Sequence, residues 1–75
     1  MKNLAQAPLK KVVEIENVEC ENFKLKRRLF ELGFLKGQKI KVERMSALGK
    51  TVMVVFRGFT LTMRKDILQY IMIKD

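Results

Sequence analysis

The stretch TVMVVFRGFTLTM, residues 51–63, decides the fold because it predicts two strands joined by a tight turn. Residues 51–56 are apolar on both faces, whereas residues 59–63 alternate between apolar and polar side chains. Such alternation indicates a half-buried strand, since successive side chains of a strand point to opposite faces. The inward positions are Phe59, Leu61 and Met63, and the outward positions are Thr60 and Thr62. Only Arg57 and Gly58 separate the two runs, and a glycine suits the positive φ of a two-residue hairpin turn.

Three further segments show the short apolar alternation that is typical of strands. They are residues 11–16 with Val13 and Ile15 inward, residues 38–44 with Ile40 and Val42 inward, and residues 70–74 with Ile71 and Ile73 inward. We expect residues 4–10, which contain Pro8, to form an extended lead-in. Residues 17–21 are expected to form a polar loop, and residues 64–68 a single helical turn.

Residues 22–32 change to the period of a helix. Leu25, Leu29 and Leu32 are spaced four and three apart, which places them on one helical face. Asn22 is a suitable N-cap, because its side-chain oxygen can accept a free backbone N–H of the first turn. Gly33 is suited to end the helix, because a left-handed conformation costs glycine least.

Seventy-five residues suffice for one domain with a small core. About five short strands and one short helix cannot cover both faces of a flat sheet, whereas a curled sheet encloses its own core. We therefore predict a mainly β fold, in which residues 1–75 form a single small SH3-like barrel of about five strands, with one short helix capping the barrel.

The formal net charge is +8 at pH 7. This charge attracts anionic surfaces without distinguishing among nucleic acid, anionic lipid and an acidic protein. The longest apolar run, residues 52–56, is far shorter than the roughly 20 residues that a membrane span requires. An apolar stretch of about 7–15 residues, as in a secretion signal, is also missing near the N-terminus. We therefore expect a cytoplasmic protein.

The usual components of catalytic and metal centres are scarce. The sequence has no His and one Cys, which excludes a His base, a Cys–His pair, an internal disulfide and the usual structural zinc sites. Glu14 and Glu16 share a strand face and could form an acid–base or metal pair, although solvated strand faces often carry such residues. Cys20, being alone, is expected to be a packing residue or a free thiol. We predict no enzymatic activity, no cofactor and no metal site.

The helix carries the strongest cluster of positive charge. Its members are Lys24, Lys26, Arg27 and Arg28. They form either a solvated helix face or a docking surface for an anionic partner. Phe23 and Phe30, seven positions apart, lie roughly opposite the leucine face. Either they pack under a loop, or they form an exposed aromatic pair that would indicate a binding surface.

Two motifs in the sequence are familiar from a known protein family. The segment RLFELGF, residues 28–34, followed by Gly37, resembles the first FeoA signature. The segments SALG, residues 46–49, and RGFTLTMR, residues 57–64, resemble the second half of the family pattern. Lys36 stands where the family often has Pro, and Met63 where it often has a smaller side chain. The family has an SH3-like barrel, in agreement with the strand pattern.

The resemblance implies mainly structural roles for the matched residues. Leu29, Leu32 and Leu61 are core candidates; Gly33, Gly37 and Gly58 meet backbone requirements; and Glu31 belongs to the motif. FeoA proteins are small cytosolic partners of FeoB, the membrane ferrous iron transporter. The resemblance therefore also implies an association with transition metal ion binding. The resemblance therefore implies an accessory or regulatory protein of ferrous iron uptake.

We predict that the outward helix face binds this partner, through Lys24, Arg27, Phe30 and Phe23. The alternative function is a small basic barrel that binds nucleic acid or serves as a repressor-type interaction domain. Thr60 and Thr62 speak against single-strand binding, which usually employs stacking aromatics. A homo-oligomer is also considered, because Met53 and Val55 give an apolar strand a second face.

Overall fold

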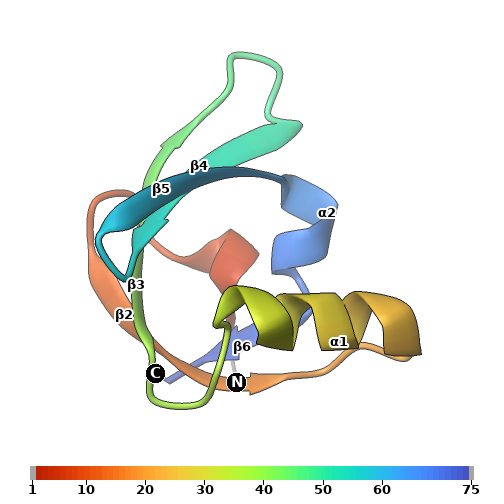
Figure 1. The fold of residues 1–75 in the computed structure, drawn as a ribbon. Coiled ribbons are helices and arrows are strands. Elements are labelled where there is room, and N and C mark those ends of the chain that lie inside the picture. Colours follow the sequence, from red (N-terminus) through yellow and green to blue (C-terminus); the bar gives the residue numbers. More distant parts are fainter. Residues whose placement is uncertain (1, 75) are drawn as a thin grey trace.

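The computed structural model describes residues 2–74 and is built mainly from short strands, with two α-helices and a 3-10 helix (Figure 1). In chain order the elements are β1 (Lys2–Asn3), η1 (Leu4–Gln6), β2 (Val12–Val18), α1 (Phe23–Leu32), β3 (Lys39–Met45), β4 (Thr51–Phe56), β5 (Phe59–Arg64), α2 (Lys65–Leu68) and β6 (Ile71–Ile73). The mainly β prediction is confirmed. The sequence predicted about five strands; the sixth, β1, has only two residues and no alternating pattern.

The six strands form one antiparallel sheet in the order β1-β6-β2-β3-β4-β5. The sheet curls into a small barrel, and α1 lies across its lower end in the view of Figure 1. Two register shifts interrupt the ladders, one in β2 between Ile15 and Asn17 and one in β3 between Val42 and Arg44. Bulges of this kind bend a strand and increase its twist, which lets a short sheet curl.

The predicted hairpin turn is confirmed. Phe56 pairs with Phe59 across the two-residue connection. Arg57 and Gly58 both have positive φ, 55° and 81°. Positive φ at both central positions is the feature of a type I′ turn, whose twist matches that of the flanking strands.

Both predicted ends of α1 are also confirmed. The side chain of Asn22 accepts a hydrogen bond from the backbone N–H of Leu25 at 3.1 Å. Gly33 has φ of 106°, and its N–H donates to the carbonyls of Leu29 and Phe30. The helix is therefore bounded by a capping side chain and a left-handed glycine, as expected from local chemistry.

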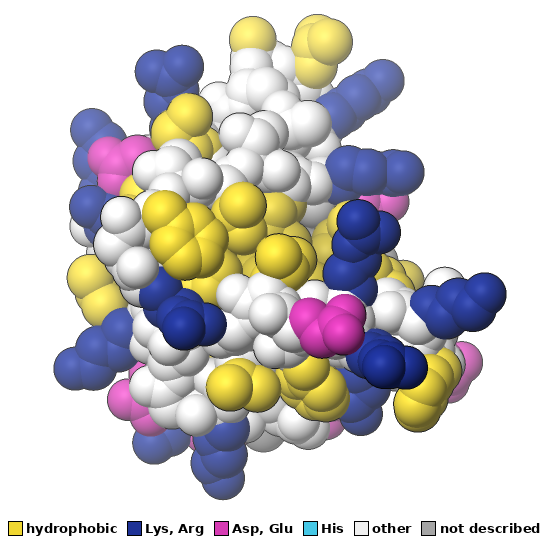
Figure 2. Space-filling model, in the orientation of Figure 1, with side chains coloured by type: hydrophobic (Ala, Val, Ile, Leu, Met, Phe, Trp, Pro, Cys, Tyr) yellow, Lys and Arg dark blue, Asp and Glu magenta, His cyan; other side chains and the backbone are white. Residues whose placement is uncertain are grey.

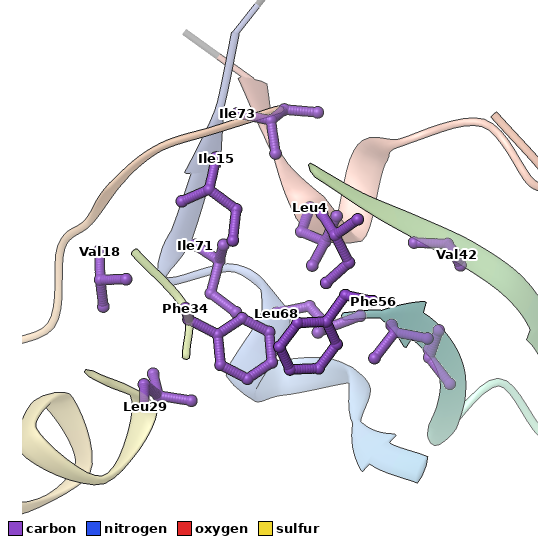
Figure 3. Close-up of a cluster of buried hydrophobic side chains, with 13 residues drawn as sticks. Leu4, Ile15, Val18, Leu29, Phe34, Val42, Phe56, Leu68, Ile71 and Ile73 are labelled. Carbon is purple, nitrogen blue, oxygen red and sulfur yellow. The ribbon is translucent and has the colours of Figure 1, made fainter. Parts of the chain in front are cut away.

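The core gathers apolar side chains from the sheet and from both α-helices (Figure 3). It contains Leu4, Ile15, Val18, Leu29, Phe34, Ile40, Val42, Val52, Val54, Phe56, Leu68, Ile71 and Ile73. Leu29 is confirmed as a core residue, and Leu61 is half-buried against the core. Leu32 was predicted to be buried but is 39% exposed, because it lies in the last turn of α1 beside a surface groove. Phe59 points to the same face as buried Phe56, with ring centroids 5.1 Å apart, as predicted, but it is still 43% exposed.

The N-terminal segment and the end of β2 contribute more than the sequence pattern indicated. The expected lead-in contains Leu4, which is fully buried and packs with α2 and β6. The expected polar loop begins later than predicted, because β2 continues to Val18 beyond the register shift at Asn17. The shift turns Val18 into the core, where it is 1% exposed.

Candidate partner-binding surface

The outward face of α1 carries an apolar groove between basic side chains. The groove has a volume of about 380 Å³ and is lined by Phe23, Lys26, Arg27 and Phe30. Phe23 is 75% exposed and Phe30 is 40% exposed. Of the two alternatives for this pair, packing under a loop or exposure to solvent, the structure therefore shows exposure.

The basic side chains of this face differ in their contacts. The ammonium of Lys26 lies 5.9 Å from the centre of the Phe30 ring, within the range of a cation–π interaction. Arg27 lies 3.8 Å from the carboxylate of Glu31, one helical turn further on. Lys24 is exposed but does not line the groove. Sequence reasoning placed Lys26 in the charge cluster but not among the binding residues, and its spacing of four from Phe30 was the available signal.

A second groove lies on the other side of α1, between this helix, β5 and α2. It has a volume of about 310 Å³ and is lined by Leu25, Arg28, Leu29, Leu32, Thr62, Met63, Arg64 and Ile67. In Figure 2, hydrophobic side chains form a band across the middle of the molecule between β5 and α1, with Lys and Arg side chains beside it. Sequence reasoning missed this groove, because its walls come from two separate segments of the chain.

Both carboxylates of the candidate acid–base or metal pair form ion pairs with lysines. Glu14 lies 2.9 Å from the ammonium of Lys74, and Glu16 lies 3.5 Å from that of Lys36. The hydrogen bond from Lys74 lowers the pKa of the Glu14 carboxyl, and the same contact raises the pKa of Lys74. Cys20 is half-buried, packs against the core and points its Sγ toward the carbonyl of Asn22 at 3.6 Å. Within residues 2–74, no three His, Cys, Asp or Glu side chains gather closely enough to hold a metal ion.

The two halves of the sequence motif meet at Gly33. A Cβ placed on this residue would collide with the side chain of Arg57, which lies in the hairpin turn between β4 and β5. Gly37 has φ of 89°, and its N–H donates to the carbonyl of Ile15 at 2.8 Å. These glycines therefore hold the end of α1 close to the barrel.

In the described part of the chain, every helix is too short or too polar to cross a bilayer.

Comparison with solved structures supports the fold. The FeoA protein of Chlorobium tepidum is 32% identical, with a TM-score of 0.83 over 95% of this chain and 67% of its own. The FeoA-like protein of Clostridium acetobutylicum is 23% identical, with a TM-score of 0.87 over 97% of this chain and 84% of its own.

A third structure carries a fold description. The FeoA of Stenotrophomonas maltophilia, in complex with zinc, is 23% identical, with a TM-score of 0.86 over 99% of this chain and 91% of its own. That protein is described as an SH3-domain protein and a candidate activating factor of bacterial ferrous iron transport. The predicted SH3-like barrel is therefore confirmed.

Two sequence comparisons complete the assignment. Comparison with curated protein sequences gave no significant match. The FeoA domain, in contrast, matches residues 2–75. This match spans nearly the whole sequence, and the chain therefore belongs to the FeoA domain family.

Proposed function

We propose that this protein is a small cytoplasmic accessory or regulatory protein of ferrous iron uptake that acts by binding the cytosolic face of a FeoB-type membrane transporter. Membership of the FeoA domain family supports the link to iron transport. The observation that carries the binding role is the solvent-exposed pair of Phe23 and Phe30 beside Lys26 and Arg27. The protein acts as a binding partner and not as an enzyme.

The chemistry of this α1 face fits a protein partner. Burying an exposed phenylalanine contributes about 1.5–3 kcal/mol, a gain that the free protein does not realise at Phe23. Aromatic and Arg side chains are enriched in the buried centres of interfaces, and charged residues form their rims. A complementary surface would present an apolar projection between carboxylates, to meet the rings, Lys26 and Arg27.

Co-purification tests this proposal. The tagged protein is mixed with membranes that contain the transporter, with and without guanine nucleotide, and the transporter retained is quantified. The double variant Arg27→Glu with Phe30→Ala is expected to lower the retained amount about tenfold or more, the effect of removing one central aromatic anchor.

The β3–β4 loop offers a matched control. Leu48 is 82% exposed and Lys50 is also exposed, so Leu48→Ala with Lys50→Glu makes a comparable charge reversal and apolar truncation on a different surface. This control should retain the transporter at the wild-type level. Equal retention by the folded α1 variant would contradict the surface, and no retention by the wild-type protein would contradict the function. Nucleic-acid binding that falls steeply between about 50 and 200 mM salt would favour the alternative role.

A further inference from the structure

The two edges of the sheet differ in how well they are protected. One edge is β1, which has only two residues. The other is β5, which has six residues and pairs with β4 without a register shift. Natural edge strands are commonly short, bulged, covered or interrupted by proline, because an open edge is a template for another strand. β5 is neither short nor bulged and has no proline, and a groove leaves space beside it, so it is the edge at which an added strand can pair.

The backbone groups that face outward on β5 follow from the register. The N–H of Lys65 donates to the carbonyl of Lys50 at 2.9 Å, directly beyond the pair of Thr51 and Arg64. Hydrogen-bonded and non-hydrogen-bonded pairs alternate along an antiparallel ladder. Residues 59, 61 and 63 therefore bond to β4, and Thr60 and Thr62 direct their N–H and C=O groups to the free edge. Within residues 2–74, no backbone group forms a hydrogen bond with these N–H and C=O groups.

The groove between α1 and β5 runs along this same edge. Three successive residues, Thr62, Met63 and Arg64, line it. Because successive side chains of a strand point to opposite faces, a groove that touches all three follows the side of the strand and not one face. The opposite wall is α1, where Leu25 is half-buried and Leu32 is 39% exposed.

The positive charge around the groove favours an acidic binding partner. Arg28 and Arg64 both line the groove. Arg28 has no ion pair with another residue of the described chain, whereas Arg64 binds Asp66 at 2.7 Å. The net charge of +8 also favours an acidic segment and opposes pairing with a second copy, which would bring like charges together.

We propose that the free edge of β5, together with the groove beside α1, binds an extended segment of a partner protein that carries alternating apolar and acidic residues. The segment adds an antiparallel or parallel strand to β5, through hydrogen bonds to the backbone of Thr60 and Thr62. Its apolar side chains contact Leu25, Leu32 and Met63, and its carboxylates pair with Arg28. This surface is separate from the outward α1 groove, so the proposal does not require the partner to be the transporter.

Hydrogen exchange on the whole protein tests this proposal directly. The probe is an end-blocked ten-residue peptide of alternating valine and glutamate, and binding is followed by NMR of the labelled protein. The peptide should bind saturably, with a Kd below about 1 mM. At saturation, exchange of the Thr60 and Thr62 amides should slow by about tenfold or more, while Leu61 and Met63, already bonded to β4, change little.

Two pairs of variants separate the backbone and charge contributions. Thr62→Pro removes an outward N–H without removing a bond to β4, whereas Thr62→Val keeps that N–H. We expect Thr62→Pro to weaken peptide binding by about fivefold or more and Thr62→Val to have little effect. Arg28→Glu should weaken binding about tenfold, whereas Arg27→Glu, on the outward face, should leave it unchanged.

Several results would overturn the proposal. One is no saturable binding of the peptide; another is equal binding of a control peptide with lysine in place of glutamate. Chemical-shift changes confined to Phe23, Lys26 and Phe30 would place the peptide in the outward groove instead. Protected Thr60 and Thr62 amides in the free protein, with sedimentation as a dimer, would show that a second copy covers the edge. The hydrogen-exchange measurement uses the wild-type protein, so it decides the question even if Thr62→Pro fails to fold.

Discussion

Two pairs of phenylalanines have opposite environments in this small domain. Phe34 and Phe56 lie in the core with ring centroids 4.6 Å apart, and they are 0% and 3% exposed. Phe23 and Phe30 lie on α1 and are 75% and 40% exposed. Because burial from water is what makes an aromatic ring stabilising, the first pair holds the barrel together. The apolar area of the second pair remains available to a partner.

Among these phenylalanines, we expect substitution of Phe34 to change the free energy of unfolding most. Phe34→Ala should lower the free energy of unfolding by about 3–5 kcal/mol, since it removes a buried ring and leaves a cavity. Urea denaturation measures the change. Because a domain of this size has a total stability of only about 4–11 kcal/mol, Phe34→Leu provides a milder variant that keeps the fold measurable. A loss below about 1 kcal/mol for Phe34→Ala would show that the ring contributes little to the core.

The Arg57-Gly58 turn directly follows Phe56 and therefore helps to position the buried pair of Phe34 and Phe56. Phe56 ends β4 and lies opposite Phe59, so a distorted turn displaces a core ring. Gly58→Val should cost about 1–3 kcal/mol, because a β-branched residue is strained at positive φ. Gly49→Ala, with φ of 71° in a longer connection, should cost less. Thermal denaturation compares the two, and equal melting temperatures would contradict the importance of the tight turn.

The exposed pair should show the smallest effect among the phenylalanines. Phe23→Ala is expected to change the free energy of unfolding by less than about 0.5 kcal/mol, as is usual for surface positions. The same urea experiment measures it beside Phe34→Ala. A loss of 2 kcal/mol or more, on the order of a buried side chain, would show that Phe23 packs in solution and is not available to a partner.

The exposed ion pair between Glu14 and Lys74 is expected to affect stability least. The pKa of Glu14 is lowered from its ordinary value of 4.5 by Lys74, so its contribution is present above that value and is lost as the pH falls through the lowered pKa. The pKa of Lys74 is raised from 10.5, so its contribution is present below that value and is lost as the pH rises through the raised pKa. The stability difference between the wild-type protein and Glu14→Gln should therefore be constant between these limits and shrink in acid. A difference that grows in acid would contradict the pairing.

The parts of the fold that depend on local chemistry could be predicted from the sequence. Asn22 and Gly33 bound α1 through contacts within a few residues, and Arg57-Gly58 fixes the hairpin through its own backbone. Alternation identified Ile15, Ile40 and Val42 as buried, because each precedes the register shift of its strand, where the alternation is still intact.

The residues that were predicted wrongly depend on distant elements or on broken periodicity. Leu4 is buried by α2 and β6, which lie at the other end of the sequence. Val18 was placed in a polar loop, but β2 continues past a bulge that turns Val18 into the core. Leu32 has the correct helical spacing, but its side chain lines the open groove between α1 and β5. The role of Lys24, Arg27, Phe30 and Phe23 in partner binding stays a prediction.

The pairing of β1 with β6 has a consequence for the order of folding. Lys2 lies opposite Ile73, so this short ladder closes a loop of roughly the whole chain. Closing a flexible loop of about 70 residues costs about 4 kcal/mol of chain entropy, more than two residue pairs recover. The contiguous hairpins β3–β4 and β4–β5 close much shorter loops and should therefore form earlier. Leu4, which the sequence pattern missed, is consequently expected to be among the last residues to enter the core.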